Sequence, residues 1–186
     1  MSLYNEIDKN MDIGIGKKYI IYSYGCQMND HDSEKISYIL EKMGYESTEN
    51  REECDLIIYN TCLVRENAEL KVYGQLGELK HLKRKNPNLI IGICGCMPQR
   101  ENIRKYIIDK FSHVDLIFGP NNIHKLPQLL NMHLQTGETI IDIVEDSREI
   151  VEDINYNRHY NYKAFVNIMY GCNNFCTYCI VPYTRG

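Results

Sequence analysis

The sequence predicts an α/β protein with a doubly wound parallel sheet in its N-terminal domain, followed by the start of a second domain. Two observations predict this fold. Short, nearly continuous apolar runs alternate along the chain with longer segments that have the apolar spacing of helices. Strands that are apolar throughout are typical of a parallel sheet that helices cover on both faces.

The first strand is expected over residues 18–24 (KYIIYSY), which are rich in β-branched and aromatic side chains. A helix should follow over about 30–43, because apolar residues recur there at positions i, i+3, i+4 and i+7 of one helical face. Gly44 is expected to end this helix. Asp32 and Glu34 are expected to support its first turn.

Two more strand–helix units follow. A buried strand over 55–60 (DLIIYN) precedes a long helix over about 65–85, which Asn86-Pro87 ends. A third buried strand over 89–94 (LIIGIC) precedes a helix over 98–110. The pattern of one strand and then one helix is typical of parallel pairing.

The domain should end with a strand over 115–118, a helix over 121–134 and an edge strand over 139–144. Composition then divides the chain. We expect a polar lead-in over 1–17, the sheet domain over 18–145, and an acidic, polar linker over 146–161. Residues 162–186 should open a second domain, with a strand over 163–169, that the chain does not complete.

Composition excludes several classes of protein. The 186 residues are 44% hydrophobic, near the globular average, which excludes wholesale disorder and collagen-like repeats. No run approaches the roughly 20 apolar residues of a membrane span, and residues 1–10 lack the pattern of a signal peptide. We therefore expect a cytoplasmic protein. The net charge of −4 neither excludes nor supports binding to RNA.

Eight cysteines are the most informative feature of the composition. In a reducing cytosol, metal ligation or redox chemistry is the better interpretation than disulfides. Three of these cysteines follow separate predicted strands by one or two residues: Cys26, Cys62 and Cys96. Ligands of open α/β sheets collect beyond the carboxyl ends of the strands, so these three thiols should converge on a metal or cluster site. The alternative is that they are ordinary buried cysteines, as we expect Cys54 and Cys94 to be.

A second group of cysteines, Cys172, Cys176 and Cys179, lies in a loop after the predicted strand 163–169. Three thiolates at this spacing can wrap one face of a 4Fe–4S cluster and leave one iron without a protein ligand. Structural zinc is the alternative, but zinc prefers four ligands and no histidine follows the loop closely. The spacing therefore favours iron–sulfur chemistry. Gly25, Gly95 and Gly171 each precede a candidate ligand and are expected to let the backbone turn tightly.

Four sequence motifs carry a family resemblance: YGCQMNDHDSE (24–34), NTCLVRENAELKVYGQLGELK (60–80), GICGCMPQ (92–99) and GCNNFCTYCIVPYTRG (171–186). From about residue 18 the chain resembles the methylthiotransferase family of radical S-adenosylmethionine (SAM) enzymes. It is most similar to the branch that modifies isopentenylated adenosine in tRNA. The resemblance implies that residues 162–186 are the first strand and cluster loop of a (β/α) radical SAM barrel.

The resemblance also implies two 4Fe–4S clusters and SAM as cofactors. Cys172, Cys176 and Cys179 would hold the cluster that cleaves SAM. An auxiliary cluster would be held by the three cysteines at the strand ends, Cys26, Cys62 and Cys96. Tyr178 stands where the superfamily places an aromatic side chain against the adenine of SAM, although simple loop packing is an alternative role.

The implied reaction is the 2-methylthiolation of N6-isopentenyladenosine beside the anticodon of tRNA. The implied partners are tRNA, contacted mainly by regions beyond this chain, and an electron donor protein, with no membrane. We expect the chain to be inactive alone. Three alternatives remain open: a sister enzyme acting on threonylcarbamoyl-adenosine or a ribosomal protein, a zinc-binding module, and a redox protein that uses Cys94-Gly95-Cys96 as a dithiol.

Overall fold

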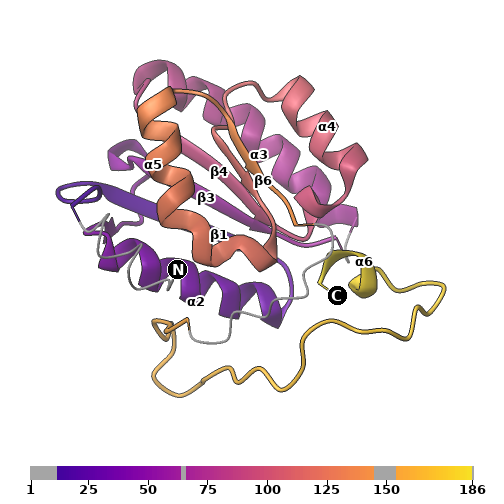
Figure 1. The fold of residues 1–186 in the computed structure, drawn as a ribbon. Coiled ribbons are helices and arrows are strands. Elements are labelled where there is room, and N and C mark those ends of the chain that lie inside the picture. Colours follow the sequence, from indigo (N-terminus) through magenta and orange to yellow (C-terminus); the bar gives the residue numbers. More distant parts are fainter. Residues whose placement is uncertain (1–11, 64–65, 145–153, 186) are drawn as a thin grey trace.

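A computed structural model describes residues 12–63, 66–144 and 154–185. Its described strands form one six-stranded sheet in the order β2-β1-β3-β4-β5-β6, and every neighbouring pair is parallel (Figure 1). The strands are β1 (Lys18–Tyr24), β2 (Glu46–Ser47), β3 (Leu56–Thr61), β4 (Ile90–Gly95), β5 (Leu116–Phe118) and β6 (Ile140–Asp142). The strand order reverses between β1 and β3, which defines a doubly wound fold with its switch point there.

Helices cover both faces of the sheet (Figure 1). The α-helices are α2 (Gln27–Lys42), α3 (Glu66–Lys85), α4 (Glu101–Lys110), α5 (Leu126–Thr136) and α6 (Val181–Thr184). The apolar side chains of α2 and α5 belong to one core cluster, and those of α3 and α4 to the other. Short 3-10 helices connect elements: η1 (Arg51–Glu53), η2 (Met97–Gln99) and η3 (Pro120–Lys125).

The two central strands explain why the sheet needs two cores. Every residue of β3 and β4 is buried. Side chains along a strand alternate between faces, so Ile57 and Tyr59 enter the core under α3, whereas Leu56 and Ile58 enter the core under α2. The prediction of a parallel sheet from continuous apolar runs is therefore confirmed, because these strands are buried on both faces.

The predicted helices form, but their ends differ from the predicted ones. The first helix begins at Gln27, three residues before the predicted start, so Asp32 and Glu34 lie beyond its first turn and their predicted role there is wrong. The predicted helix 98–110 divides at Arg100, whose extended backbone (φ −77°, ψ 120°) separates η2 from α4. Pro127 lies in the first turn of α5, a position where a missing backbone N–H costs no helical hydrogen bond.

One strand was not predicted and one predicted strand is wrong. The two residues of β2 are exposed and polar, so they carry no hydrophobic pattern, and they pair with Lys18 and Tyr19. The predicted strand 163–169 does not form, because no described strand pairs with it and its backbone has no ladder to join. Its apolar side chains remain exposed, for example Val166 at 77% and Ile168 at 93%.

Residues 154–165 cross the outer side of α2. The backbone N–H of Asn157 donates to the carbonyl of Glu34 at 3.2 Å, and His31 contacts the rings of Tyr156 and Phe165 at centroid distances of 4.8 and 5.8 Å. Part of the predicted linker is therefore packed on the sheet domain. The rest of it, up to residue 153, lies outside the described residues, as does the lead-in up to residue 11. The domain boundaries remain predictions.

Among the described residues, no helix combines the length and the apolar composition that crossing a bilayer requires.

Candidate metal centre at the carboxyl edge of the sheet

Three strands bring the first group of cysteines to one level. Tyr24, Thr61 and Gly95 are aligned across β1, β3 and β4, and each of them ends its strand. Cys26 follows the first of these residues by two positions, and Cys62 and Cys96 follow the other two directly. The three cysteines line one cavity of about 320 Å³. The sequence-based prediction that they converge is confirmed.

The thiols of this group also contact one another. The Cys62 thiol is in hydrogen-bonding contact with both Cys26 and Cys96. Cys62 and Cys96 are 2% and 5% exposed, whereas Cys26 is exposed at the mouth of the cavity. None of the eight cysteines forms a disulfide, so all three thiols are available as ligands.

Asn29 fixes the loop that carries Cys26. Cys26 is the N-cap of α2, and its backbone N–H donates to the side-chain oxygen of Asn29 at 3.3 Å. The Cys26 thiol donates to the same oxygen at 3.4 Å, and the Asn29 backbone N–H donates to the Cys26 carbonyl at 2.9 Å. The sulfur is therefore held at the start of the helix, where the helix dipole favours negative charge.

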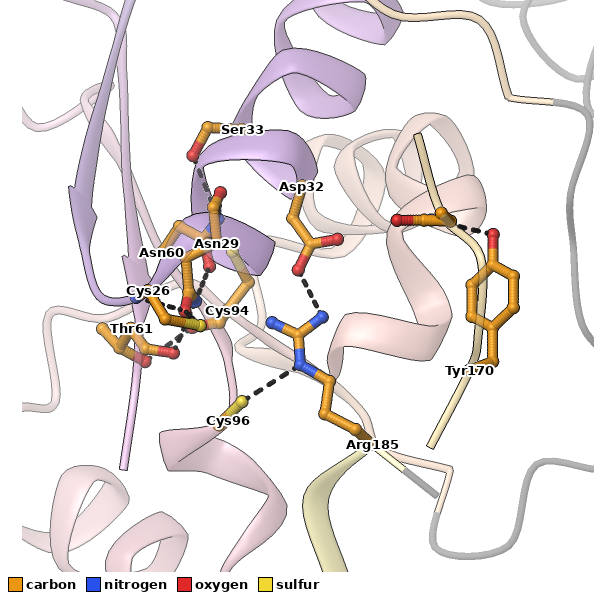
Figure 2. A network of polar contacts seen from close by, with 11 residues as sticks. Cys26, Asn29, Asp32, Ser33, Asn60, Thr61, Cys94, Cys96, Tyr170 and Arg185 are labelled. Carbon is orange, nitrogen blue, oxygen red and sulfur yellow. Dashed lines mark hydrogen bonds and ion pairs between the residues drawn. The ribbon is translucent and has the colours of Figure 1, made fainter. Parts of the chain in front are cut away.

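Asn60, at the end of β3, joins this loop to the next (Figure 2). Its Oδ1 accepts from Asn29 Nδ2 at 2.9 Å, and its Nδ2 donates to the Asn29 carbonyl at 2.8 Å and to Ser33 Oγ at 3.0 Å. Asn29 and Asn60 are both 0% exposed. Because buried amide groups are costly unless they are paired, this reciprocal pair holds α2 against β3 in one geometry.

Thr61 extends the network to the third cysteine. Its carbonyl accepts from Asn29 Nδ2 at 3.0 Å and from the Cys96 N–H at 2.8 Å. Its hydroxyl donates to the carbonyl of Cys94 at 2.6 Å. The loops that carry the three cysteines are thus tied to one buried set of hydrogen bonds (Figure 2).

Glycines make the close approach of these loops possible. Gly95 has φ of +91°, and a Cβ there would lie 2.3 Å from the carbonyl oxygen of Thr61. A Cβ at Gly25 would lie 2.3 Å from Asn29 Oδ1 and 2.8 Å from the Cβ of Cys62. Only glycine fits either position. The predicted tight turns before these two cysteines are confirmed.

An ion pair from a distant part of the chain closes one side of the cavity. Nη1 of Arg185, which follows α6, donates to Asp32 Oδ2 at 2.6 Å, and its Nε donates to Cys96 Sγ at 3.3 Å (Figure 2). Sequence reasoning missed Arg185, Asn29 and Asn60 as site residues. The one available signal was an asparagine inside the otherwise apolar strand DLIIYN.

Hydrogen bonding and a nearby positive charge favour the thiolate form of Cys96. The pKa of Cys96 is lowered to about 6, first because the Cys62 thiol hydrogen-bonds to it and second because the Arg185 guanidinium lies beside it. The pKa of Cys26 is raised, because of its hydrogen bond with Cys62 and because of burial. Thiolate is the form of cysteine that binds metals, so the lowered pKa of Cys96 favours ligation at this position.

Cys94 lies apart from this arrangement. It is 0% exposed in the core cluster under α2, and burial raises its pKa well above the ordinary value. A reactive dithiol needs an accessible thiolate, so burial disfavours a redox pair of Cys94 with Cys96. Cys54 is also buried, and its thiol donates to the carbonyl of Leu56 at 2.9 Å.

The second group of cysteines has a different setting. Cys176 is exposed, Cys172 and Cys179 are half-buried, and their thiols form no hydrogen bond with the residues that the structure describes. The backbone does turn in this loop, since the Cys179 N–H donates to the Cys176 carbonyl at 3.0 Å. Tyr178 is 92% exposed, so it does not pack within the loop. Sites at these four residues remain predictions.

The chemistry of the first group fits an iron–sulfur cluster. Within the described parts of the chain, no group of three or more cysteine, histidine or carboxylate side chains is arranged around a single metal ion. Zinc needs all its ligands about 2.0–2.3 Å from one point. A four-iron cluster takes each cysteine on a different iron, so its ligands lie further apart around a larger space. The three thiols line one cavity, and they would meet that requirement by moving apart from their mutual contacts.

The fold and the site together define a class: a doubly wound domain with three cysteines beyond the carboxyl ends of three neighbouring strands. Residues 18–119, which contain all three cysteines, match the model of the Uncharacterized protein family UPF0004. The chain belongs to this family.

Curated relatives match nearly the whole chain, and three of them carry the name tRNA-2-methylthio-N(6)-dimethylallyladenosine synthase. The relative from Alkaliphilus oremlandii (strain OhILAs) is 58% identical over 173 residues, which are 93% of this chain and 37% of the relative. The relative from Clostridioides difficile (strain 630) is 56% identical over 173 residues, 92% of this chain and 36% of the relative. The relative from Clostridium perfringens (strain 13 / Type A) is 54% identical over all 186 residues, which span 40% of its length.

Proposed function

We propose that this chain is part of a tRNA methylthiotransferase that converts N6-isopentenyladenosine beside the anticodon into its 2-methylthio derivative. The observation that carries the proposal is the convergence of Cys26, Cys62 and Cys96 on one cavity, in a chain 54–58% identical to synthases named for this product. The chain spans only 36–40% of the length of those relatives. We therefore expect it not to turn over substrate alone.

The first group of cysteines would hold one 4Fe–4S cluster. Cys96 is the natural first ligand, because its pKa of about 6 makes it largely thiolate at neutral pH. Cys62 contacts both other thiols and would take the central position. Asn29 and Asn60 would hold the start of α2 against the end of β3, and the three thiols would move apart from their mutual contacts to reach separate irons.

The second group, Cys172, Cys176 and Cys179, would hold a second 4Fe–4S cluster and leave one iron open for SAM. When bound, such a cluster supplies the electron that cleaves SAM and so provides reactivity that no side chain has. The exposed ring of Tyr178 is free to stack on an adenine. The other partners that we propose are tRNA and an electron donor protein.

Two measurements test this proposal. Anaerobic reconstitution should give about eight irons and eight acid-labile sulfides per chain, as two four-iron clusters require. A protein that carries the remaining length of the relatives should then add the methylthio group to tRNA containing N6-isopentenyladenosine, detected by mass spectrometry of the nucleosides. Activity only on threonylcarbamoyl-adenosine would assign the chain to the sister branch. Roughly one zinc and no iron would overturn the proposal.

A further inference from the structure

Arg185 joins the segment that carries the second group of cysteines to the site of the first. It pairs with Asp32, 153 positions away in the sequence, and donates to Cys96, 89 positions away. The side chains of Arg185 and Asp32 are 13% and 6% exposed. Figure 1 shows α6 close to the start of α2, which is consistent with these contacts.

One nitrogen of the guanidinium, Nη2, has no hydrogen-bond partner among the described residues. Arginine has five N–H groups in a rigid, planar fork. Nη1 of Arg185 donates to Asp32 and Nε to Cys96, whereas Nη2 is buried without a partner among the described residues. Buried donors without an acceptor are rare, which indicates that a group bound in the cavity would supply the acceptor.

Charged side chains of both signs line the cavity. Arg185 and Lys35 both line the cavity, and the ammonium group of Lys35 forms no hydrogen bond or ion pair with the part of the chain that the structure describes. Asp32 lies near both cations. Within the cavity, Arg185 already donates to one sulfur, Cys96 Sγ, as well as to one carboxylate oxygen, Asp32 Oδ2.

We propose that Arg185 is a positioning residue for the metal centre: its Nε fixes Cys96, and its Nη2 donates to a sulfur of the cluster held by Cys26, Cys62 and Cys96. This inference rests on the proposed function. Hydrogen bonds to the sulfur atoms of iron–sulfur clusters raise their reduction potential, because they stabilise the added negative charge. Arg185 should therefore hold the potential of this centre at a higher value than the thiolates alone would.

The test uses the chain with Cys172→Ala, Cys176→Ala and Cys179→Ala, so that only one centre titrates. In that background, Arg185→Met is compared with Arg185→Lys and with Arg158→Met. Arg158 is an exposed arginine in the same segment and serves as the matched control. Each chain is reconstituted anaerobically, its iron is counted, and its midpoint potential is measured by a redox titration followed optically.

We expect Arg185→Met to lower the midpoint potential, Arg185→Lys to give an intermediate value, and Arg158→Met to match the unsubstituted chain. A folded Arg185→Met chain that loses its iron also supports the inference, because Cys96 would then need Arg185 to bind. An Arg185→Met chain with full iron and an unchanged potential would overturn it.

Amide hydrogen exchange in the iron-free chain separates failure of this inference from failure of the proposed function. If the unsubstituted chain binds no iron, the proposed function fails and the role towards the cluster fails with it. Arg185→Met and Asp32→Asn should still speed exchange in residues 181–185 several-fold, since both break the ion pair. Unchanged exchange in both variants would overturn the positioning of this segment by Arg185.

Discussion

The two groups of cysteines occupy opposite kinds of setting. The first group lies beyond three aligned strands, on loops tied to a buried hydrogen-bond network, and two of its thiols are almost inaccessible. The second group lies in a loop between residues 163–169, which form no strand, and the short helix α6. Its thiols make no hydrogen bond with the described residues. The positions of the thiols in the first group are therefore fixed by the strands and buried amides around the cysteines. The spacing of cysteines along the sequence does not by itself fix them.

Two glycines at equivalent places give the strongest test of this comparison. Gly95 and Gly171 both precede a candidate ligand and both have positive φ, +91° and +65°. An alanine at Gly95 would also clash with the Thr61 carbonyl. We expect Gly95→Ala to lower the free energy of unfolding in urea by about 4 kcal/mol and Gly171→Ala by only about 1 kcal/mol. Equal losses would contradict the view that only the first loop is held tightly.

Two asparagines test the role of the buried network. Asn60→Ala removes the partners of Asn29 and Ser33, so buried amide and hydroxyl groups lose their hydrogen bonds. We expect a loss of about 2 kcal/mol of unfolding free energy and a reduced iron content. Asn167→Ala is the comparison in the segment of the second group, where an exposed amide donates to the Tyr170 hydroxyl at 3.0 Å; because Asn167 also lines the cavity, only the unfolding free energy is compared. Its effect should be below about 0.5 kcal/mol, and a larger one would show that the second region is more ordered than we infer.

Thiol accessibility gives a third contrast. In the reduced, iron-free chain, Cys176 is exposed whereas Cys62 is 2% exposed. We expect iodoacetamide to label Cys62 roughly tenfold more slowly than Cys176, as measured by mass spectrometry of the peptides. Equal rates would mean that the first group opens freely to solvent, against the packing described here.

The smallest expected effect is a pH dependence of stability, which arises at His31 where α2 contacts residues 154–165. Burial lowers the pKa of His31, while Glu34 and Asp32 act to raise it and Lys35 acts to lower it. On the opposing segment, Tyr156 and Phe165 contribute uncharged faces.

Below the ordinary histidine pKa of about 6.5, the unfolded chain takes up a proton at His31 that the folded chain resists. The stability that neutral His31 provides is therefore present above that pH and is lost as the pH falls towards the lowered value. The loss should be smaller in His31→Asn. Urea unfolding between pH 5 and 8 measures it, and parallel curves for the two chains would contradict this assignment.

The parallel sheet and the convergence of the first cysteine group could be predicted because short stretches of sequence carry the signals for both. Apolar runs mark the strands, and the position of each cysteine just after such a run fixes its place at the sheet edge. The strand 163–169 was predicted wrongly from equally good local signals, since a strand also needs a partner. Arg185 and Asp32 could not be paired from sequence, because 153 positions separate them and no periodicity relates them.

We expect Cys26, Cys62 and Cys96 to form a metal centre within the sheet domain, without the second group of cysteines. The most direct measurement is iron and acid-labile sulfide per chain in the variant with Cys172→Ala, Cys176→Ala and Cys179→Ala, after anaerobic reconstitution. We expect about four irons and four sulfides per chain in this variant. Adding Cys62→Ala should remove them. No iron in the first variant, or roughly one zinc in its place, would contradict it.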